Sequence, residues 1–271
     1  MQNKNRNWGV FMFERLKKLY PLLITGFVFF YFYSIVINDR IIGLGAIRHF
    51  LYRLLFVHTL IPGQALTLTG PWWFFGLIFQ LYLLFPLLFK LIKKHNVMAF
   101  TLICLLSYIW IYITQYVYSP KADIMLFQNA PGHLPEFALG ILFALNPKKR
   151  IHFIWGLLAL VIFSLGNFYQ PFFPLTFLSV TILFWFGIEK AIPFILNKTK
   201  VLKTILLYYD SISMILFVIH GPLRNPFISA SSSTFYGQIF AAFLFLIVAT
   251  ALSILGKMLY QWMVNKINTY I

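Results

Sequence analysis

The segment "PWWFFGLIFQLYLLFPLLFKLIKKH", residues 71–95, decides the fold class. No charged side chain occurs in it up to Phe89, and its lysines and its histidine all lie at the far end. A membrane-spanning helix needs about 20 mostly apolar residues, and cytoplasmic segments beside such helices collect lysine and arginine. The stretch therefore predicts a helix that crosses a bilayer and ends in the cytoplasm at His95. Trp72 and Trp73 are expected to anchor its outer end, and Gln80 is expected to face other helices, because an amide facing lipid is costly.

The composition extends this interpretation to the whole chain. Of the 271 residues, 61% are hydrophobic and 10% are charged, whereas soluble domains carry about 25% charged residues. One soluble core could not bury so much apolar surface, so a water-soluble enzyme is excluded. The excess of 22 Lys and Arg over 6 Asp and Glu alternates with the apolar segments, which favours membrane topology over nucleic-acid binding. The single cysteine, Cys104, offers neither a disulfide nor a thiolate metal site, and no metal is expected.

Eight segments are predicted to span the membrane in one all-α, polytopic helical bundle. Most Lys and Arg residues follow alternate segments, which predicts that both termini are cytoplasmic. Neither an internal repeat nor a soluble domain is evident, so we expect a single membrane domain over residues 1–271. The predicted spans are Leu19 to Ile37, Trp73 to Leu91, Val97 to Val117, Leu134 to Leu145, Phe153 to Tyr169, Phe173 to Ile188, Ile205 to His220 and Tyr236 to Leu255. The basic residues assigned to the outer side are Arg40, Arg48, Arg53, Lys121 and Arg224.

The segment Ile41 to Pro62 lies between two helix ends that are both assigned outside, so it must not cross. It is predicted to form an amphipathic or re-entrant helix on the outer side. A helix would place His49 and Arg53, four residues apart, on one face. Two interpretations remain open: a helix lying in the membrane interface with its arginines reaching toward water, or the lid or wall of a polar site.

Ionisable side chains within a membrane bundle are functional candidates by default. His133 and Glu136 lie three residues apart near the outer end of a short helix, where either could bind a hydroxyl or act as a general base. A structural alternative for Glu136 is a carboxylate favoured by the helix dipole. His220 ends a later span, where it is either a catalyst or a hydrogen-bonded interface residue.

The basic segment "FMFERLKKLYP", Phe11 to Pro21, precedes the first predicted span. Arg15, Lys17 and Lys18 could hold the phosphates of an anionic cofactor, or they could serve only as cytoplasmic anchors. The sequence contains no GxSxG, HExxH, GxxxxGK[ST] or GxGxxG motif. A hydrolase triad, a zinc protease and a nucleotide-driven pump therefore have no support.

Four stretches together resemble the integral-membrane acyltransferase family 3, in order and spacing over nearly the whole chain. Phe11 to Pro21 is similar to its basic motif, with Arg15 and Lys18 at the cationic positions. "LPEFALGILFAL" and "SISMILFVIHGPL" are similar to two later helices of the family. The helix that opens at Pro71 matches a family motif at Trp73, Phe74, Gln80, Tyr82 and Pro86.

The resemblance implies transfer of an acyl group from cytoplasmic acyl-CoA to a hydroxyl, most often of a glycan outside the membrane. It makes Arg15 and Lys18, with Lys17 beside them, the contacts of the coenzyme A phosphates. The residues implied to line a central cavity are Arg48, His58, Trp73, Gln80, Tyr82, Glu136 and His220.

Two features depart from the family pattern. The family's first helix carries an arginine and the histidine usually taken as the general base, and no such helix precedes Met1. The chain is therefore expected to lack the family's first two helices, and His220 and His133 stand in as candidate bases. Many members also carry glutamate where this chain has Ile78, which suggests a different subgroup or a different acceptor.

From these observations we expect a membrane O-acyltransferase of the plasma (bacterial inner) membrane that moves an acyl group, expected to be acetyl, onto a cell-surface polysaccharide. Acyl-CoA, expected to be acetyl-CoA, would be the co-substrate, with no bound cofactor. One alternative is a polysaccharide flippase or exporter subunit, which needs no phosphate site at Arg15 to Lys18. A second is a truncated, non-catalytic remnant or partner of a full-length homologue.

Overall fold

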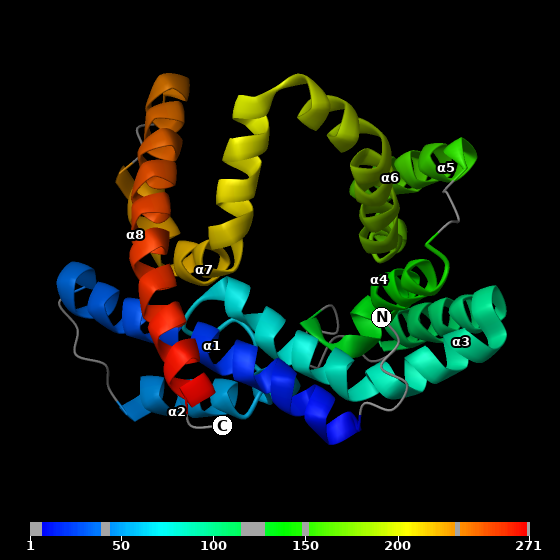
Figure 1. The fold of residues 1–271 in the computed structure, drawn as a ribbon, viewed down its shortest axis with the longest axis horizontal. Coiled ribbons are helices and arrows are strands. Elements are labelled where there is room, and N and C mark those ends of the chain that lie inside the picture. Colours follow the sequence, from blue (N-terminus) through cyan, green and yellow to red (C-terminus); the bar gives the residue numbers. More distant parts are fainter. Residues whose placement is uncertain (1–6, 39–43, 115–127, 148–151, 231–233, 270–271) are drawn as a thin grey trace. The chain divides into compact units, whose positions relative to one another are not determined.

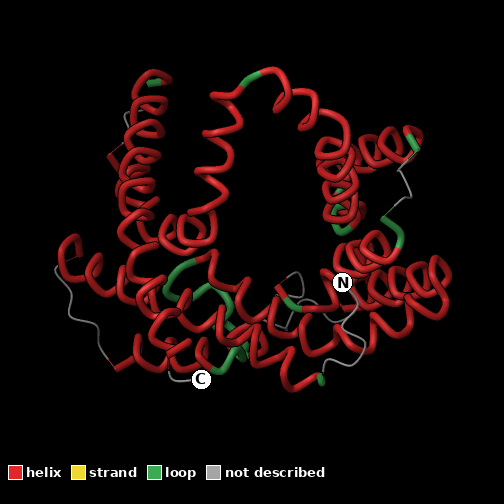
Figure 2. The backbone as a smooth tube through the Cα atoms, viewed as in Figure 1, coloured by secondary structure: helices red, strands yellow, loops and turns green. Residues whose placement is uncertain are grey.

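The computed structural model is built from helices and loops (Figures 1 and 2). It describes residues 7–38, 44–114, 128–147, 152–230 and 234–269, and within these ranges it contains no strand. The predicted all-α membrane bundle is thereby confirmed. Among the charged residues used for the topology, Lys4, Arg6, Arg40, Lys121 and Lys148 to Arg150 lie outside the described residues.

Each predicted span falls on a helix where its residues are described; Gln115 to Val117 of the third span lie outside the described residues. The described residues contain five helices that are long and apolar enough to cross a membrane, and two shorter apolar helices of 16 residues each. The shorter two rise about 24 Å, less than the hydrocarbon thickness of about 30 Å, so their crossing stays a prediction. The helices are α1 (Trp8–Asn38), α2 (Leu44–Leu54), α3 (Trp73–Ile113), α4 (Ala130–Leu145), α5 (Phe153–Phe168), α6 (Leu175–Lys198), α7 (Lys200–Ala230) and α8 (Phe235–Thr269).

Helix α3 holds two of the predicted spans. Its 41 residues are interrupted at Asn96, whose φ of 51° and ψ of −123° are not helical. Gln80 in the first half bonds to Asn129 and Ser107 in the second half bonds to Pro131. Because both halves reach the start of α4, α3 folds back at Asn96 as a hairpin. Lys93 and Lys94, exposed beside Asn96, mark the turn that the sequence assigned to the cytoplasm.

Helix α2 is the predicted non-crossing helix between the first two spans. Its 11 residues rise about 16 Å, too short to span a bilayer. A single 3-10 turn, His58–Leu60, and a loop connect it to a second 3-10 turn, Gly70–Trp72, which leads into α3.

The chain divides into two compact units, each described by itself. The first comprises residues 1–76 and 206–271, and the second comprises residues 77–205. In the first unit, α8 packs on α1 and α1 packs on α2. In the second, α6 packs on α5 and α4, and the buried core joins Leu88, Ile92 and Ile103 of α3 to Leu139 and Leu142 of α4.

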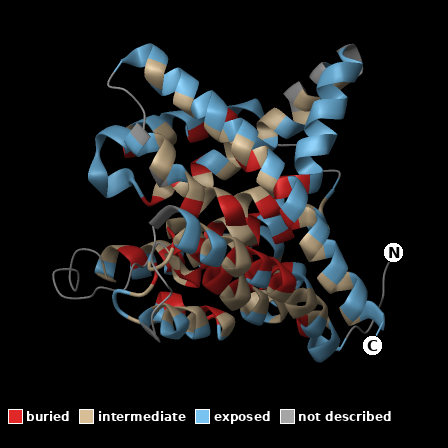
Figure 3. Ribbon diagram, turned by 90° about the vertical axis from the view of Figure 1, so that its left-hand side faces the viewer, coloured by how far each residue is buried: buried red, intermediate tan, exposed pale blue. Residues whose placement is uncertain are grey.

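Most turns of the long helices are coloured as exposed in Figure 3, and buried residues gather where helices pack on one another. Many exposed side chains are large and apolar, among them Phe184 at 68% exposed and Phe240 at 66%. Apolar side chains exposed all along a helix match a hydrocarbon environment, in which they need no partner within the protein.

Candidate functional site

The first unit gathers a group of polar residues at the end of α2 and in the segment that leads into α3, all of them buried except the half-buried Thr67. We call it the polar cluster: Arg53, His58, Thr67, Thr69 and Trp72. Arg53, His58 and Trp72 are each 0% exposed, and Thr69 is 6% exposed. Burying so many polar groups in an apolar bundle is costly unless they are hydrogen-bonded. The polar cluster is therefore a candidate functional site in this unit.

The backbone around the polar cluster is held in an unusual conformation. Phe56 has a φ of 56° and Leu68 a φ of 64°. Bulky residues rarely adopt positive φ, which costs about 1–3 kcal/mol and is found most often at functional sites. The surrounding packing must hold Phe56 and Leu68 in this conformation. The two residues lie before and after His58 in the chain.

Arg53 carries the positive charge of the polar cluster. Its Nη1 donates to the His49 carbonyl at 3.1 Å and to Thr67 Oγ1 at 3.2 Å, and its Nη2 donates to the Thr67 carbonyl. No carboxylate among the described residues forms an ion pair with it, and burial lowers the pKa of Arg53 from 12.5 to about 10. The polar cluster thus contains a cation that only neutral oxygens stabilise, which makes it receptive to an anion.

His58 is held in its neutral form. Burial and the nearby charge of Arg53 lower the pKa of His58 from 6.5 to about 4. Its Nε2 lies 3.1 Å from the Trp72 carbonyl, and because a carbonyl only accepts, Nε2 carries the proton. Its Nδ1 is buried and has no hydrogen-bond partner among the described residues. The Tyr52 backbone also interacts with the ring, so Nδ1 is an acceptor nitrogen enclosed within the polar cluster.

Trp72 fastens the polar cluster to α7. Its indole Nε1 donates to the Val218 carbonyl at 2.9 Å. Within a helix that carbonyl would accept from the N–H four residues later, but residue 222 is proline and has no N–H. Trp72 takes the carbonyl that Pro222 leaves free, and it is buried in the protein; the expectation that it anchors the chain in the membrane interface is wrong.

Two glycines allow helices to approach the polar cluster closely. A Cβ added to Gly76 would lie 2.8 Å from Thr59 Oγ1 and 3.0 Å from His58 Cε1. A Cβ added to Gly221 would lie 2.1 Å from Thr69 Oγ1. A real Cβ essentially never makes a contact shorter than 3.0 Å, so a larger residue at either position would force the neighbouring side chain to shift. Thr69 Oγ1 is buried without a hydrogen-bond partner among the described residues, so its hydroxyl remains available.

His220 precedes Gly221 on α7 and is half-buried. Its Nδ1 lies 3.2 Å from the Leu216 carbonyl, so Nδ1 carries a proton and, in the neutral ring, Nε2 is the acceptor. A backbone carbonyl that orients the ring in this way is a common arrangement for a general base.

The basic residues of α1 lie on the same unit. Arg15 and Lys18, three residues apart, share one face of the helix, and Arg15 sits 5.0 Å over the Phe11 ring. Further along α1, the Tyr20 hydroxyl donates to the Leu54 carbonyl at 3.1 Å. Leu54 follows Arg53, so this bond ties the basic end of α1 to the polar cluster.

In the second unit, Gln80 faces protein, as predicted. Its Nε2 donates to Asn129 Oδ1 at 2.8 Å, and its Oε1 accepts from the Ala130 N–H at 2.9 Å. The amide thereby satisfies one of the N–H groups that the start of α4 leaves without an intrahelical partner. Ser107 donates to the Pro131 carbonyl. That carbonyl has no helical donor, because the residue four positions later, Pro135, has no N–H. The same relation holds between Val218 and Pro222. Gln80 thus has a structural role in positioning α4.

His133 and Glu136 lie together on α4, as their spacing predicts. His133 Nδ1 is 3.6 Å from Glu136 Oε2, and both side chains are about one-sixth exposed, at 15% and 16%. Glu136 also lines an apolar pocket of about 350 Å³ with Phe85, Phe89 and Phe137. Neither carboxylate oxygen accepts a hydrogen bond from a described residue, so Glu136 is a second candidate for binding a hydroxyl.

The predicted site residues divide between the two units. The first unit holds the basic residues Arg15, Lys17 and Lys18 together with His58, Trp73 and His220, and it holds Arg48, which is exposed on α2 outside the polar cluster. The second unit holds Gln80, Tyr82, His133 and Glu136. Tyr82 and Trp73 are half-buried. No group of three or more metal-ligating side chains occurs among the described residues.

Sequence reasoning missed the roles of Arg53, Thr69 and Trp72. Arg53 and Arg48 stand in similar apolar surroundings in the sequence, and only the fold buries one of them. A signal for Trp72 was present in Pro222, which leaves a carbonyl in need of a donor, but nothing in the sequence connects the two positions.

A family model described as an acyltransferase domain matches residues 1–260, which is nearly the whole chain. No matching curated protein and no matching solved structure was found.

Proposed function

The chain belongs to the acyltransferase family whose model it matches over residues 1–260, and from this membership we propose that it moves an acyl group from acyl-CoA to a hydroxyl of a glycan outside the cytoplasm. Acetyl is the proposed group. The proposed direction follows from the distribution of Lys and Arg, which favours cytoplasmic termini in the inner membrane. Arg15, Lys17 and Lys18 would then meet the donor from inside.

The observation that carries the proposal is the connection between the basic end of α1 and the polar cluster. The hydrogen bond from Tyr20 to the Leu54 carbonyl packs α1 against the residue that follows Arg53. A donor whose phosphates contact Arg15 and Lys18 would lie within a few helical turns of the buried cation. Phosphates favour clustered cations, and a thioester under attack develops a negative oxygen that a buried cation stabilises strongly.

His220 is the proposed general base. Its Nδ1 is engaged by the Leu216 carbonyl, which leaves Nε2 to take the proton of an acceptor hydroxyl. That hydroxyl oxygen then attacks the thioester carbonyl carbon, the carbon–sulfur bond breaks, and the proton leaves with the coenzyme A thiol. His58, with its pKa lowered to about 4, is too weak a base for this step near neutral pH and is instead proposed to accept a hydrogen bond at Nδ1.

The test is binding of acetyl-CoA to the full chain in detergent or nanodiscs. The double variant Arg15→Glu, Lys18→Glu is expected to weaken binding about tenfold or more, because two phosphate-binding cations become repulsive anions. The matched control is Lys93→Glu, Lys94→Glu, the same charge change at the exposed turn of α3, which is expected to bind normally.

A parallel assay measures release of the coenzyme A thiol in the presence of a polysaccharide acceptor. His220→Gln is expected to remove acceptor-dependent release and leave donor binding intact. Normal acetyl-CoA binding by the Arg15 and Lys18 variant would contradict the proposed donor site and favour transport. Acetyl-CoA binding without any release by the wild-type chain would favour a non-catalytic role.

A further inference from the structure

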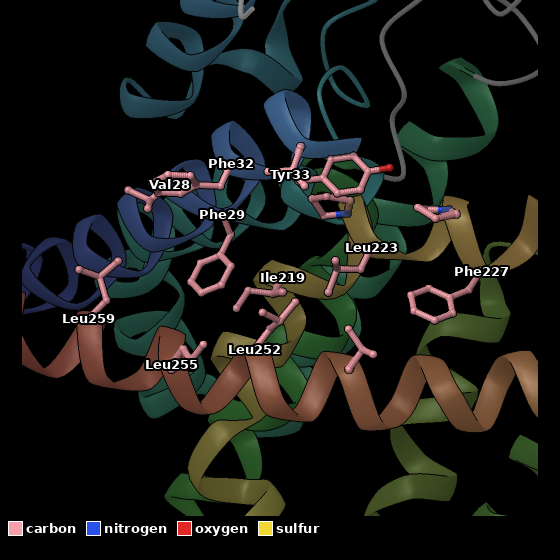
Figure 4. Close-up of a pocket in the computed structure, with 14 residues that line it drawn as sticks. Val28, Phe29, Phe32, Tyr33, Ile219, Leu223, Phe227, Leu252, Leu255 and Leu259 are labelled. Carbon is pink, nitrogen blue, oxygen red and sulfur yellow. The ribbon is translucent and has the colours of Figure 1, made fainter. Parts of the chain in front are cut away.

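The first unit contains an apolar groove that the transfer reaction does not use. It is formed by α1, α7 and α8 and has a volume of about 590 Å³, within the range of about 300–1,000 Å³ typical of ligand pockets. Figure 4 shows Phe29 of α1, Ile219 of α7 and Leu252 of α8 pointing into it. Its size and its three walls mark it as a binding groove.

Each helix lines the groove with one regular face. On α8 the lining residues Val248, Leu252, Leu255 and Leu259 are spaced by four, three and four positions, which is one face of an α-helix. Gly221, which approaches the polar cluster, points away from the groove face of α7 by its position in the helical repeat. Helix α7 therefore separates the groove from the polar cluster.

The lining is hydrocarbon almost throughout. The described residues that line the groove include no charged side chain, and Tyr33 is the one with a hydroxyl. The groove is also open along one edge, where Leu255 is 57% exposed and Phe32 is 60% exposed. In a helix pair that spans a bilayer, such an edge faces lipid chains, so a hydrocarbon chain can enter from the side.

A second pocket, which includes a positive charge, adjoins the groove at Phe227. Phe227 lines the groove and also lines a second pocket of about 400 Å³, which Arg224 and Gln238 complete. Two small residues of α8, Ala241 and Ala242, leave the space for this second pocket. Arg224 is exposed and belongs to the side that the charge distribution assigns to the outside. A cation and an amide in a pocket beside an apolar groove complement an anionic head group joined to a hydrocarbon chain.

We propose that the groove binds one hydrocarbon chain of a phosphate-bearing membrane lipid, with the phosphate held by Arg224 and Gln238. The chain would lie against the residues of α1, α7 and α8 described above, and Phe227 would pack beside it where chain and head group meet. Arginine suits this role because its guanidinium donates two parallel hydrogen bonds to a phosphate. This lipid site goes beyond acyl transfer, which does not require it.

The test uses the full chain in dodecyl maltoside micelles, a matrix without phosphate, to which phosphatidylglycerol with a photoreactive diazirine in one chain is added. After illumination, labelled peptides are mapped by mass spectrometry. Wild-type protein is expected to be labelled at groove residues of α7 and α8. Leu252→Trp and Leu255→Trp fill the groove, and labelling is expected to fall to near background. Leu255→Trp also guards against misfolding, because this position is more than half exposed.

Leu246→Trp is the matched control, since Leu246 lies on the same helix, is 50% exposed and faces away from the groove. It is expected to be labelled like the wild type. Unlabelled phosphatidylglycerol is then added to compete with the photoreactive lipid. The Arg224→Glu variant is expected to require about tenfold more of it for the same loss of labelling. Diacylglycerol with the same chains, and inorganic phosphate alone, are each expected to compete poorly.

Three results would overturn the proposal. The first is groove labelling that persists in both tryptophan variants. The second is competition by diacylglycerol as strong as that by phosphatidylglycerol, which would remove the role of Arg224. The third is a photoreactive residue placed at position 252 that links to a second protein chain instead of to lipid, since the groove would then be a protein interface.

Discussion

The hydrogen bond from Trp72 to the Val218 carbonyl should depend on Pro222 in a measurable way. Trp72→Phe removes the indole N–H and leaves the buried carbonyl without a donor, because proline 222 cannot supply one. An unsatisfied buried acceptor costs about 1–3 kcal/mol, and the smaller ring adds a packing loss of about 1 kcal/mol. We expect Trp72→Phe to lower the free energy of unfolding by about 2–4 kcal/mol.

In a Pro222→Ala background the same substitution should cost less. Alanine restores the N–H that donates to the carbonyl four residues earlier, so only the packing loss remains. The expected coupling energy between the two substitutions is about 1–3 kcal/mol. Reversible unfolding of the detergent-solubilised protein in SDS, followed by far-UV circular dichroism, measures all four proteins of the cycle.

A control separates this bond from a general loss of tryptophan. Trp155→Phe on α5, where the side chain is 58% exposed, should change the free energy of unfolding by less than about 0.5 kcal/mol. If Trp72→Phe lowers the free energy of unfolding equally with proline and with alanine at position 222, the hydrogen bond to the Val218 carbonyl does not depend on Pro222, and the reasoning is refuted.

Three further predictions concern single sites. The pKa of His58 is lowered to about 4 in the fold, against 6.5 when unfolded. Between these pH values the unfolded chain binds more protons than the folded chain. Stability is therefore lost as the pH falls from 6.5 to 4, by up to about 3 kcal/mol. His58→Gln should flatten that part of a thermal-unfolding pH profile; an unchanged profile would show that another group titrates. Gly221→Ala should destabilise by about 1–3 kcal/mol through overpacking, and Thr69→Ala, which removes the nearest clashing atom, should partly restore the melting temperature; no rescue would mean that the clash lies elsewhere. Gln80→Leu should cost about 1–3 kcal/mol in the same assay, because Asn129 and the N–H that opens α4 lose their partner; a neutral result would show that Gln80 does not position α4.

The sequence predicts the parts of this fold that follow from local pattern. Apolar length places helices at the described parts of all eight predicted spans, and α2, at 11 residues, is too short to span a bilayer, in keeping with the predicted non-crossing helix. The cost of an amide in lipid correctly turns Gln80 toward protein. Each of these inferences needs only the residues on one segment and the bilayer as solvent.

The polar cluster could not be predicted in the same way. It joins the end of α2, the start of α3 and the middle of α7, and Trp72 and Val218 are 146 positions apart. Arg48 and Arg53 differ little in local sequence, yet one is exposed and the other is fully buried. The burial comes from long-range packing at Gly76 and Gly221, which no local pattern records.

The hairpin of α3 also fixes how long α4 can be. Gln80 binds the first residue of α4, and Asn96, at the turn of the hairpin, accepts a hydrogen bond from Asn146 just past its last residue, at 3.3 Å. Asn96 is 16 positions after Gln80, and Asn146 is 16 positions after Ala130. The length of the first arm of the hairpin, from Gln80 to Asn96, therefore sets the length of α4. Insertion or deletion of one residue in either helix would shift one anchor by about 1.5 Å along the axis and rotate it by about 100°, so the two lengths can change only together.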